Sequence, residues 1–178
     1  MLRTLQQILK TGIVTEVPPA PAEELRVREA LQSRIREVLG RALCIRAVDA
    51  GSCNGCELEI HALGNPIYSI ESLGIRFVAS PRHADLLLVT GPVSRHMEVA
   101  LRRTYDATPD PKLVVAVGDC GACGGVFGDG YASCGAVSNV IAVDVVVPGC
   151  PPSPARVLAG ILAAISPSPD ESTRGSGQ

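Results

Sequence analysis

The sequence predicts a single α/β domain with a doubly wound, mostly parallel sheet. Short runs rich in Val, Leu and Ile alternate along the chain with stretches of helical periodicity, a pattern typical of successive βαβ units. The 178 residues are 46% hydrophobic but only 3% aromatic, with no Trp. The core must therefore be aliphatic, as it is in sheets that are buried on both faces.

Five segments are expected to be strands, because each is a short β-rich run bounded by turn-forming residues. They are 43–50, 75–80, 84–91, 112–118 and 142–149. The third, ADLLLVTG, is nearly all apolar, which indicates a central parallel strand.

Helices are expected between these strands and before the first of them, since apolar residues recur there at helical spacing. The predicted helices are 24–40, 56–64, 94–107 and 153–165. Gly40 suits the end of the first, and Ser153 followed by Pro154 suits the start of the last. The alternation predicts a flavodoxin-like α/β domain over residues 41–165.

The remaining residues form two extensions. Residues 1–40 are interpreted as a short amphipathic docking helix at 2–13, a proline-rich linker and the helix at 24–40. We expect the first helix to dock on a partner or a membrane surface and the second to pack on the chain's own body. Residues 166–178 have the composition of a disordered tail.

Charge and hydropathy exclude several classes of protein. The net charge is −2, and no basic stripe interleaved with aromatic residues is present, so we expect no nucleic acid partner. No apolar run reaches the ~18–20 residues that span a bilayer, and the apolar residues at the N-terminus are spaced rather than massed, unlike a secretory signal. Three scattered histidines, at 61, 83 and 96, are more typical of surface or capping groups than of ligands.

Seven cysteines without a secretory signal are more typical of metal ligands or reactive thiols than of disulfides. Cys53 and Cys56 follow the first strand, Cys120 follows the fourth, and Cys150 follows the fifth. Loops that leave the carboxyl ends of parallel strands converge on one crevice. The sequence therefore predicts that four thiols from three remote segments meet at one edge of the sheet.

Four thiolates can hold either Zn²⁺ or an iron–sulfur cubane. Glycines around them allow the backbone to approach inorganic sulfur and donate N–H bonds, which favours the cubane. These glycines are Gly51, Gly55, Gly118, Gly121, Gly124, Gly125 and Gly149.

Two rival interpretations are weaker. A thioredoxin-like pair of Cys53 and Cys56 leaves Cys120 and Cys150 without a role. A zinc ribbon requires two C-x-x-C pairs ~15–20 residues apart, whereas 63 residues separate Cys56 from Cys120. Spacing alone leaves open whether Cys120 or Cys123 is the third ligand.

Cys44 and Cys134 are expected to be small buried hydrophobic residues. Glu57 and Glu59 are a pair of carboxylates on the helix that starts at Cys56. Glu59 lies one turn after that cysteine, where it would relay protons or hydrogen-bond a partner, or would be an ordinary solvated carboxylate. The glycine-rich GDCGACGGVFGDG matches neither common phosphate-binding motif, so nucleotide binding is not expected.

Four blocks, in this order, carry a resemblance to a known family: DAGSCNGCELEI (49–60), residues 65–93, PDPKLVVAVGDCGACGG (109–125) and VPGCPPSP (147–154). They resemble the small subunit of energy-converting, membrane-associated [NiFe]-hydrogenases of the formate hydrogenlyase type. The same family includes the 20 kDa subunit of complex I, the NADH-quinone oxidoreductase. The resemblance covers residues 41–165.

The resemblance implies that Cys53, Cys56, Cys120 and Cys150 bind one [4Fe–4S] cluster, with Cys123 a bystander. The family's acidic position after the second cysteine falls on Glu59. Complex I subunits have adjacent first ligands, whereas Asn54 and Gly55 separate them here. This spacer favours the hydrogenase branch.

The resemblance further implies an electron-transfer subunit whose cluster lies next to the active site of a partner large subunit. A ferredoxin-like iron–sulfur subunit and membrane subunits would be further partners, at the cytoplasmic face of the cell membrane. The alternatives are a complex I-like quinone oxidoreductase subunit, a related nickel-free complex, or a module whose metal only holds an interface together.

Overall fold

The computed structural model describes residues 23–166. The amphipathic docking helix expected at 2–13, nearly all of the linker, and the tail from residue 167 lie outside the described residues. Within the described part, no helix is both long and apolar enough to cross a membrane.

Five strands form one sheet in which every neighbouring pair is parallel. Their order is β2-β1-β3-β4-β5, the flavodoxin-like order. The strands are β1 Leu43–Asp49, β2 Ile75–Phe77, β3 Leu86–Thr90, β4 Leu113–Val117 and β5 Val145–Val147. The predicted fold class is confirmed.

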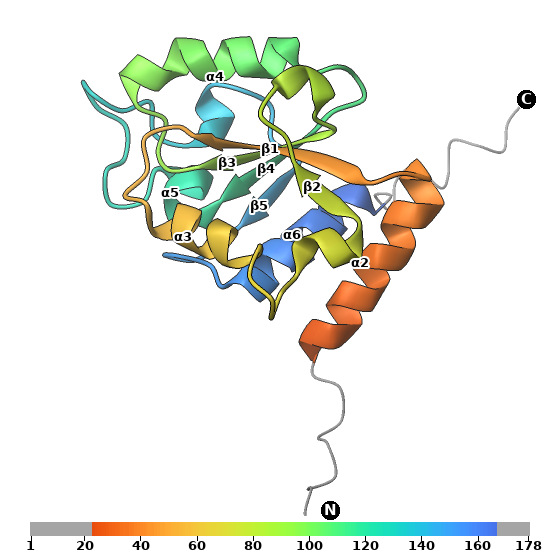
Figure 1. Ribbon diagram of the computed structural model, residues 1–178. Coiled ribbons are helices and arrows are strands. Elements are labelled where there is room, and N and C mark those ends of the chain that lie inside the picture. Colours follow the sequence, from red (N-terminus) through yellow and green to blue (C-terminus); the bar gives the residue numbers. More distant parts are fainter. Residues whose placement is uncertain (1–22, 167–178) are drawn as a thin grey trace, which may run out of the picture.

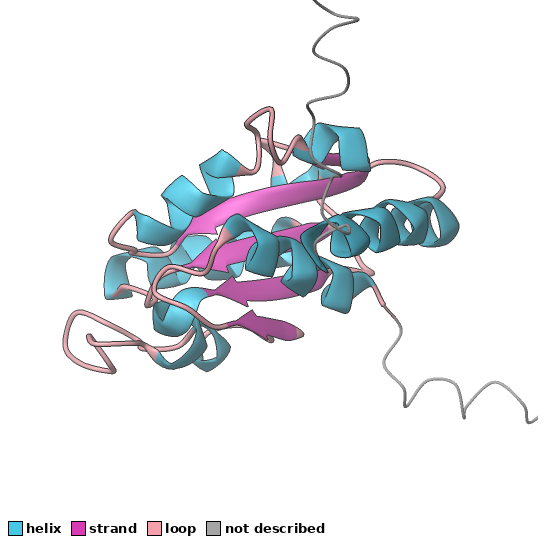
Figure 2. Ribbon diagram, turned by 90° about the horizontal axis from the view of Figure 1, so that it is seen from below, coloured by secondary structure: helices cyan, strands magenta, loops and turns pink. Residues whose placement is uncertain are grey.

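Helices cover both faces of this sheet, as Figures 1 and 2 show. The α-helices are α2 Glu23–Leu39, α3 Gly55–Ala62, α4 Arg95–Ala107, α5 Gly118–Cys123 and α6 Pro154–Ile165. Short 3-10 helices are η1 Ile70–Leu73, η2 Pro81–His83 and η3 Val137–Asn139. One apolar cluster joins α2, α3 and α6 to the sheet, and a second joins α4 and η3 to its other face.

The α2 helix packs on the chain's own body. Leu31 and Ile35, one turn apart, are 0% and 2% exposed and belong to the cluster that includes α6. Gly40 follows the helix with φ +60, a conformation in which glycine ends helices at little cost. The packing expected for this helix is confirmed.

The two edge strands are shorter than predicted, since β2 and β5 each span three residues. In the described part of the chain each of them pairs with one neighbouring strand, so its ladder ends where that pairing ends. The α5 helix was not expected from the glycine-rich sequence. Gly118 takes φ +85, which turns the chain from β4 directly into that helix.

Candidate metal centre

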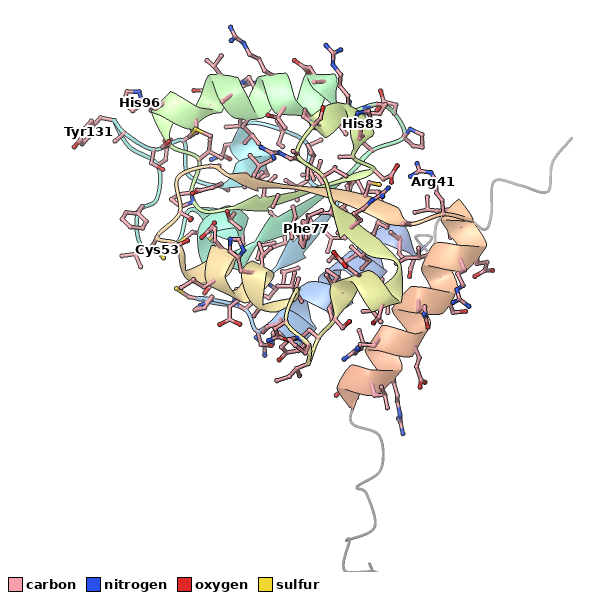
Figure 3. The ribbon with its side chains drawn as sticks, in the orientation of Figure 1. Arg41, Cys53, Phe77, His83, His96 and Tyr131 are labelled. Carbon is pink, nitrogen blue, oxygen red and sulfur yellow. The ribbon has the colours of Figure 1, made fainter. Side chains whose placement is uncertain are left out.

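The four predicted ligands lie at the carboxyl edge of the sheet and line one small cavity. Cys53 follows β1, Cys56 lies in the first turn of α3, Cys120 lies in α5, and Cys150 follows β5. The rest of the cavity wall consists of Ser52, Gly55, Gly91, Asp119, Gly149 and Pro151. Cys53 is labelled at this end of the molecule in Figure 3. The predicted convergence of three remote segments is therefore present.

The loop before Cys53 is held by Asp49, the last residue of β1. Its Oδ1 accepts hydrogen bonds from the N–H groups of Gly51 at 2.8 Å and Ser52 at 2.9 Å. Gly91, after β3, packs against this loop so closely that a Cβ there would lie 2.6 Å from the nitrogen of Ser52. The loop between β1 and Cys53 therefore packs closely against the end of β3.

Asp119 joins the segments that carry Cys120 and Cys150. Its Oδ1 accepts a 2.8 Å hydrogen bond from the N–H of Gly149, and its own N–H donates to the Gly149 carbonyl at 2.8 Å. These two bonds fix the loop after β5 against the start of α5. Asp119 is not among the site residues predicted from the sequence. Its position directly before a cysteine at a strand end is the signal that could have identified it.

Two glycines bring the backbone against the thiols. A Cβ at Gly118 would lie 2.6 Å from Sγ of Cys56, and a Cβ at Gly125 would lie 2.7 Å from Sγ of Cys120. Both glycines have positive φ, +85 and +54. No side chain fits at either position, so the cysteine sulfurs are backed by bare main chain, as sulfur ligands that accept N–H bonds require.

Burial and mutual repulsion oppose ionisation of the inner thiols. The pKa of Cys56, which is buried, is raised to about 11, first by burial and then by Glu57 and the other three cysteines of the set. The pKa of half-buried Cys120 is raised by burial and then by Cys150 and Cys53. Because burial and the neighbouring thiols raise the pKa of Cys56 and of Cys120, a positively charged centre in the cavity is what would hold these two as thiolates.

The four thiols line one cavity, and the two kinds of centre that such a set can hold differ in the spacing of the sulfurs. Among residues 23–166, no three His, Cys, Asp or Glu side chains lie close enough together to hold one metal ion. In a Cys₄ zinc site every sulfur lies ~2.3 Å from the same ion. In a cubane each thiolate binds a different iron, so the sulfurs stand farther apart.

The other cysteines lie outside this cavity. Cys123 is exposed, and its thiol donates to the carbonyl of Asp119 at 3.2 Å. Cys134 is buried, and its thiol donates to the Glu98 carboxylate at 3.4 Å. Cys44 is buried within β1. Burial was expected for the last two, whereas the contact of Cys134 with a carboxylate was not.

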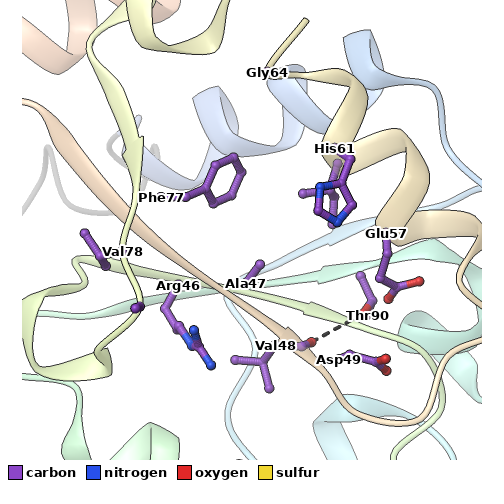
Figure 4. A pocket seen from close by; sticks show the side chains of 12 residues that line it. Arg46, Ala47, Val48, Asp49, Glu57, His61, Gly64, Phe77, Val78 and Thr90 are labelled. Carbon is purple, nitrogen blue, oxygen red and sulfur yellow. Dashed lines mark hydrogen bonds between the residues drawn. The ribbon is translucent and has the colours of Figure 1, made fainter.

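The two carboxylates of α3 differ in their surroundings. Glu59 is half-buried and does not line the cysteine cavity, so its role as a proton relay stays a prediction. Glu57 has both carboxylate oxygens buried, without a hydrogen-bond partner among the described residues. It lines a second, larger cavity, shown in Figure 4. Spacing from Cys56 favours Glu59 and gives no sign that the carboxylate oxygens of Glu57 are buried.

A parallel α/β sheet with four cysteines at its carboxyl edge can hold a metal centre in the crevice where sheets of this kind bind ligands. Residues 53–164 match the family described as "NADH ubiquinone oxidoreductase, 20 Kd subunit". The chain belongs to this family of oxidoreductase subunits, and the predicted resemblance is confirmed.

Two curated relatives show the range of the family. The chain is 42% identical to formate hydrogenlyase subunit 7 of Escherichia coli over 136 residues, which are 76% of this chain but 53% of that protein. It is 43% identical to the probable membrane-bound hydrogenase subunit mbhJ of Pyrococcus furiosus over 141 residues, which are 78% of this chain and 84% of that one. The chain thus matches about half the length of the first relative and most of the second.

Two solved structures have a fold similar to that of this chain. A chain of the membrane-bound sulfane sulfur reductase, an archaeal respiratory membrane complex, superposes with a TM-score of 0.62 at 33% identity, covering 80% of this chain and 74% of that chain. A chain of an NAD⁺-reducing [NiFe]-hydrogenase superposes with a TM-score of 0.55 at 19% identity, over 72% of this chain and 95% of that one. The second likeness shows the fold alone.

Proposed function

We propose that this chain holds one [4Fe–4S] cluster on Cys53, Cys56, Cys120 and Cys150 and transfers electrons at the active site of a partner large subunit. The observation that carries the proposal is the single cavity that all four thiols line, although they come from three remote segments. The bound cluster would supply one-electron redox chemistry.

The residues of this chain would set the position and environment of that chemistry. Hydrogen bonds from Asp49 and Asp119 fix the ligand loops, and the bare backbone of Gly118 and Gly125 packs against two of the sulfurs. Burial of Cys56 excludes water from the inner side. A rigid, partly dry site keeps the cluster's distance and potential constant, and bond-making chemistry belongs to the large subunit.

We assign the complex to the hydrogenase type. Two of the relatives carry the names of formate hydrogenlyase and membrane-bound hydrogenase subunits, and the Asn54–Gly55 spacer between the first ligands favours that branch. The name of the second relative, a membrane-bound hydrogenase subunit, supports association with a membrane complex. We extend the proposal to a peripheral position on the cytoplasmic face of the cell membrane and to a ferredoxin-like subunit as a further partner, as the family resemblance implies.

The cluster is tested on the full chain, co-expressed with its partner large subunit and purified without oxygen. We expect about four iron and four sulfide per chain, with broad visible absorbance. Cys53→Ala and Cys150→Ala should lose both, while the control Cys134→Ala should keep them. Stoichiometric zinc without sulfide would overturn the proposal and support a structural metal module.

The reaction is tested by measuring H₂ release from the reduced complex. Release that is lost in Cys53→Ala supports the hydrogenase assignment. An intact, reducible cluster without H₂ release would assign the chain to the quinone-reducing or nickel-free relatives instead.

A further inference from the structure

A cavity of about 520 Å³ lies at the open edge of the sheet, beside the cysteine site and separate from it (Figure 4). Its walls are β1 residues 46–49, one side of α3, and the segment that follows β2. The lining side chains include Glu57 and His61 from α3 and Phe77 from β2. The proposed cluster role does not use this cavity.

One wall is a strand edge that has no neighbouring strand among residues 23–166. The β2 strand pairs with β1 only over Leu43–Ile45, and the last hydrogen bond runs from the N–H of Val78 to the Ile45 carbonyl at 2.9 Å. Beyond that bond the chain leaves the sheet, while β1 continues for four residues, to Asp49. Figure 1 shows β1 running on past the end of β2.

The backbone groups at this edge that lack a strand partner among the described residues belong to Ala47 and Asp49. In a parallel sheet, alternate residues of a strand bond to opposite neighbours. The N–H of Ala50 donates to the Thr90 carbonyl of β3 at 3.1 Å, so residues 46, 48 and 50 face β3, and 47 and 49 face the cavity. The backbone N–H and C=O of Ala47 therefore have no partner strand within residues 23–166. An open edge of this kind pairs readily with a further strand.

The cavity also contains polar groups that lack partners. Both carboxylate oxygens of Glu57 are buried without a hydrogen bond among the described residues, as is Nε of Arg46. Figure 4 shows Glu57 on the α3 side of the strand and Arg46 on the opposite side. Such groups cost free energy until a donor reaches the carboxylate and an acceptor reaches the guanidinium.

We propose that an extended segment of the partner large subunit adds to the sheet as a strand beside Ala47 and Asp49, and brings a basic side chain to Glu57. This inference rests on the proposed function, since it takes the large subunit as the partner. An extended main chain offers both N–H and C=O groups at strand spacing. Its carbonyls also satisfy Arg46, and a basic side chain satisfies Glu57.

The position of the cavity gives the added strand a role in electron transfer. Glu57 directly follows Cys56, so a strand in the cavity lies beside the cluster ligands. Phe77, 39% exposed, provides an apolar wall against which side chains of the added strand pack. Strand addition therefore fixes the register of the large subunit relative to the cluster, and with it the electron-transfer distance.

Hydrogen exchange of the unmodified chain, alone and in the co-purified complex, gives the direct test. We expect the Ala47 amide to exchange at least about tenfold more slowly in the complex. Val48, which already faces β3, is the internal control and should change little. An Ala47 amide that exchanges equally fast in a stable, cluster-loaded complex overturns the inference. Protection that appears in the isolated chain on raising its concentration would mean a second copy is the occupant, and also overturns it.

Two variants test the backbone pairing and the charge contact separately, each by its affinity for the large subunit. Ala47→Pro removes the open N–H but leaves the bonds to β3 intact, and Glu57→Gln removes the charge. Each should weaken binding about tenfold or more with iron and sulfide unchanged. The control is Glu71→Gln, at an exposed position of η1, which should bind as the unmodified chain does.

Failure of this inference is distinguishable from failure of the proposed function. Unchanged affinity in Ala47→Pro overturns the added strand, and unchanged affinity in Glu57→Gln overturns the basic side chain, while the cluster persists in both. If the unmodified chain binds no cluster or no large subunit, the proposed function itself is wrong. If Ala47→Pro fails to fold, hydrogen exchange of the unmodified chain decides.

Discussion

A Cβ at Gly118 would lie 2.6 Å from the Sγ of Cys56. Gly118 begins α5, after β4, and Cys56 lies in the first turn of α3, after β1, so the contact joins two of the three segments that carry the proposed ligands. Non-bonded atoms do not approach so closely without displacement. The absence of a side chain at Gly118 is thus a condition for the position of the Cys56 thiol.

Gly118→Ala should therefore lower the cluster content. The added methyl displaces the Cys56 sulfur, and φ +85 strains any residue other than glycine by about 1–3 kcal/mol. Iron and sulfide per chain and urea unfolding measure the two effects. Gly130→Ala is the control, because a Cβ there meets nothing within 4 Å. Full iron and sulfide content in the Gly118 variant would show that the thiol does not need this position.

Cys120 and Cys123 should respond differently to replacement by alanine. Cys120 lines the cavity with the other three thiols, whereas the exposed Cys123 thiol donates to a backbone carbonyl of its own helix. We expect Cys120→Ala to lose the visible absorbance and Cys123→Ala to keep it. The opposite result would assign the third ligand to Cys123.

The carboxyl group of Glu98 should titrate below its ordinary range. Its pKa is lowered first by the hydrogen bond from the Cys134 thiol and then by Arg102. The stabilisation is present above the ordinary pKa and is lost as the pH falls through the lowered folded-state value. Carboxyl-carbon NMR titration should show a higher pKa for Glu98 in Cys134→Ala than in the unmodified chain. Equal values in the two proteins would rule out the thiol as the cause.

Leu31→Ala should destabilise the domain by about 2–5 kcal/mol, because it leaves a cavity where α2 packs on the core. Leu31 is 0% exposed and lies remote from the cysteine cavity, so iron and sulfide content should stay unchanged. Val38→Ala, on the same helix but 51% exposed, should change the free energy of unfolding by less than about 0.5 kcal/mol. Urea unfolding of both variants makes the comparison, and equal losses would contradict the burial of Leu31.

Much of the fold was predictable because its signals are local. The nearly all-apolar run at Leu86–Thr90 is fully buried in the centre of the sheet, and Ser153 and Pro154 do begin α6. The convergence of Cys53, Cys120 and Cys150 followed from topology, since all the strands are parallel and their carboxyl ends share one edge.

Other features were not predictable, because they depend on distant neighbours. Nothing near Glu57 in the sequence indicates that its carboxylate is buried while that of Glu59 is not. The length of β2 depends on where its pairing with β1 ends, and the helical turn at Gly118 depends on a positive φ at that residue. The hydrogen bond of Cys134 to Glu98 joins residues 36 apart in the sequence.

Residue type and spacing along short stretches are enough to predict the aliphatic core, the alternation of strands and helices, and the four cysteines at strand ends. Three further features exist only in the folded molecule: a glycine lies against each of two thiols, β1 has an edge that is open among the described residues, and a buried carboxylate lies beside that edge. These relationships are contacts between segments far apart in the chain, and no local periodicity encodes a contact before the sheet brings the segments together.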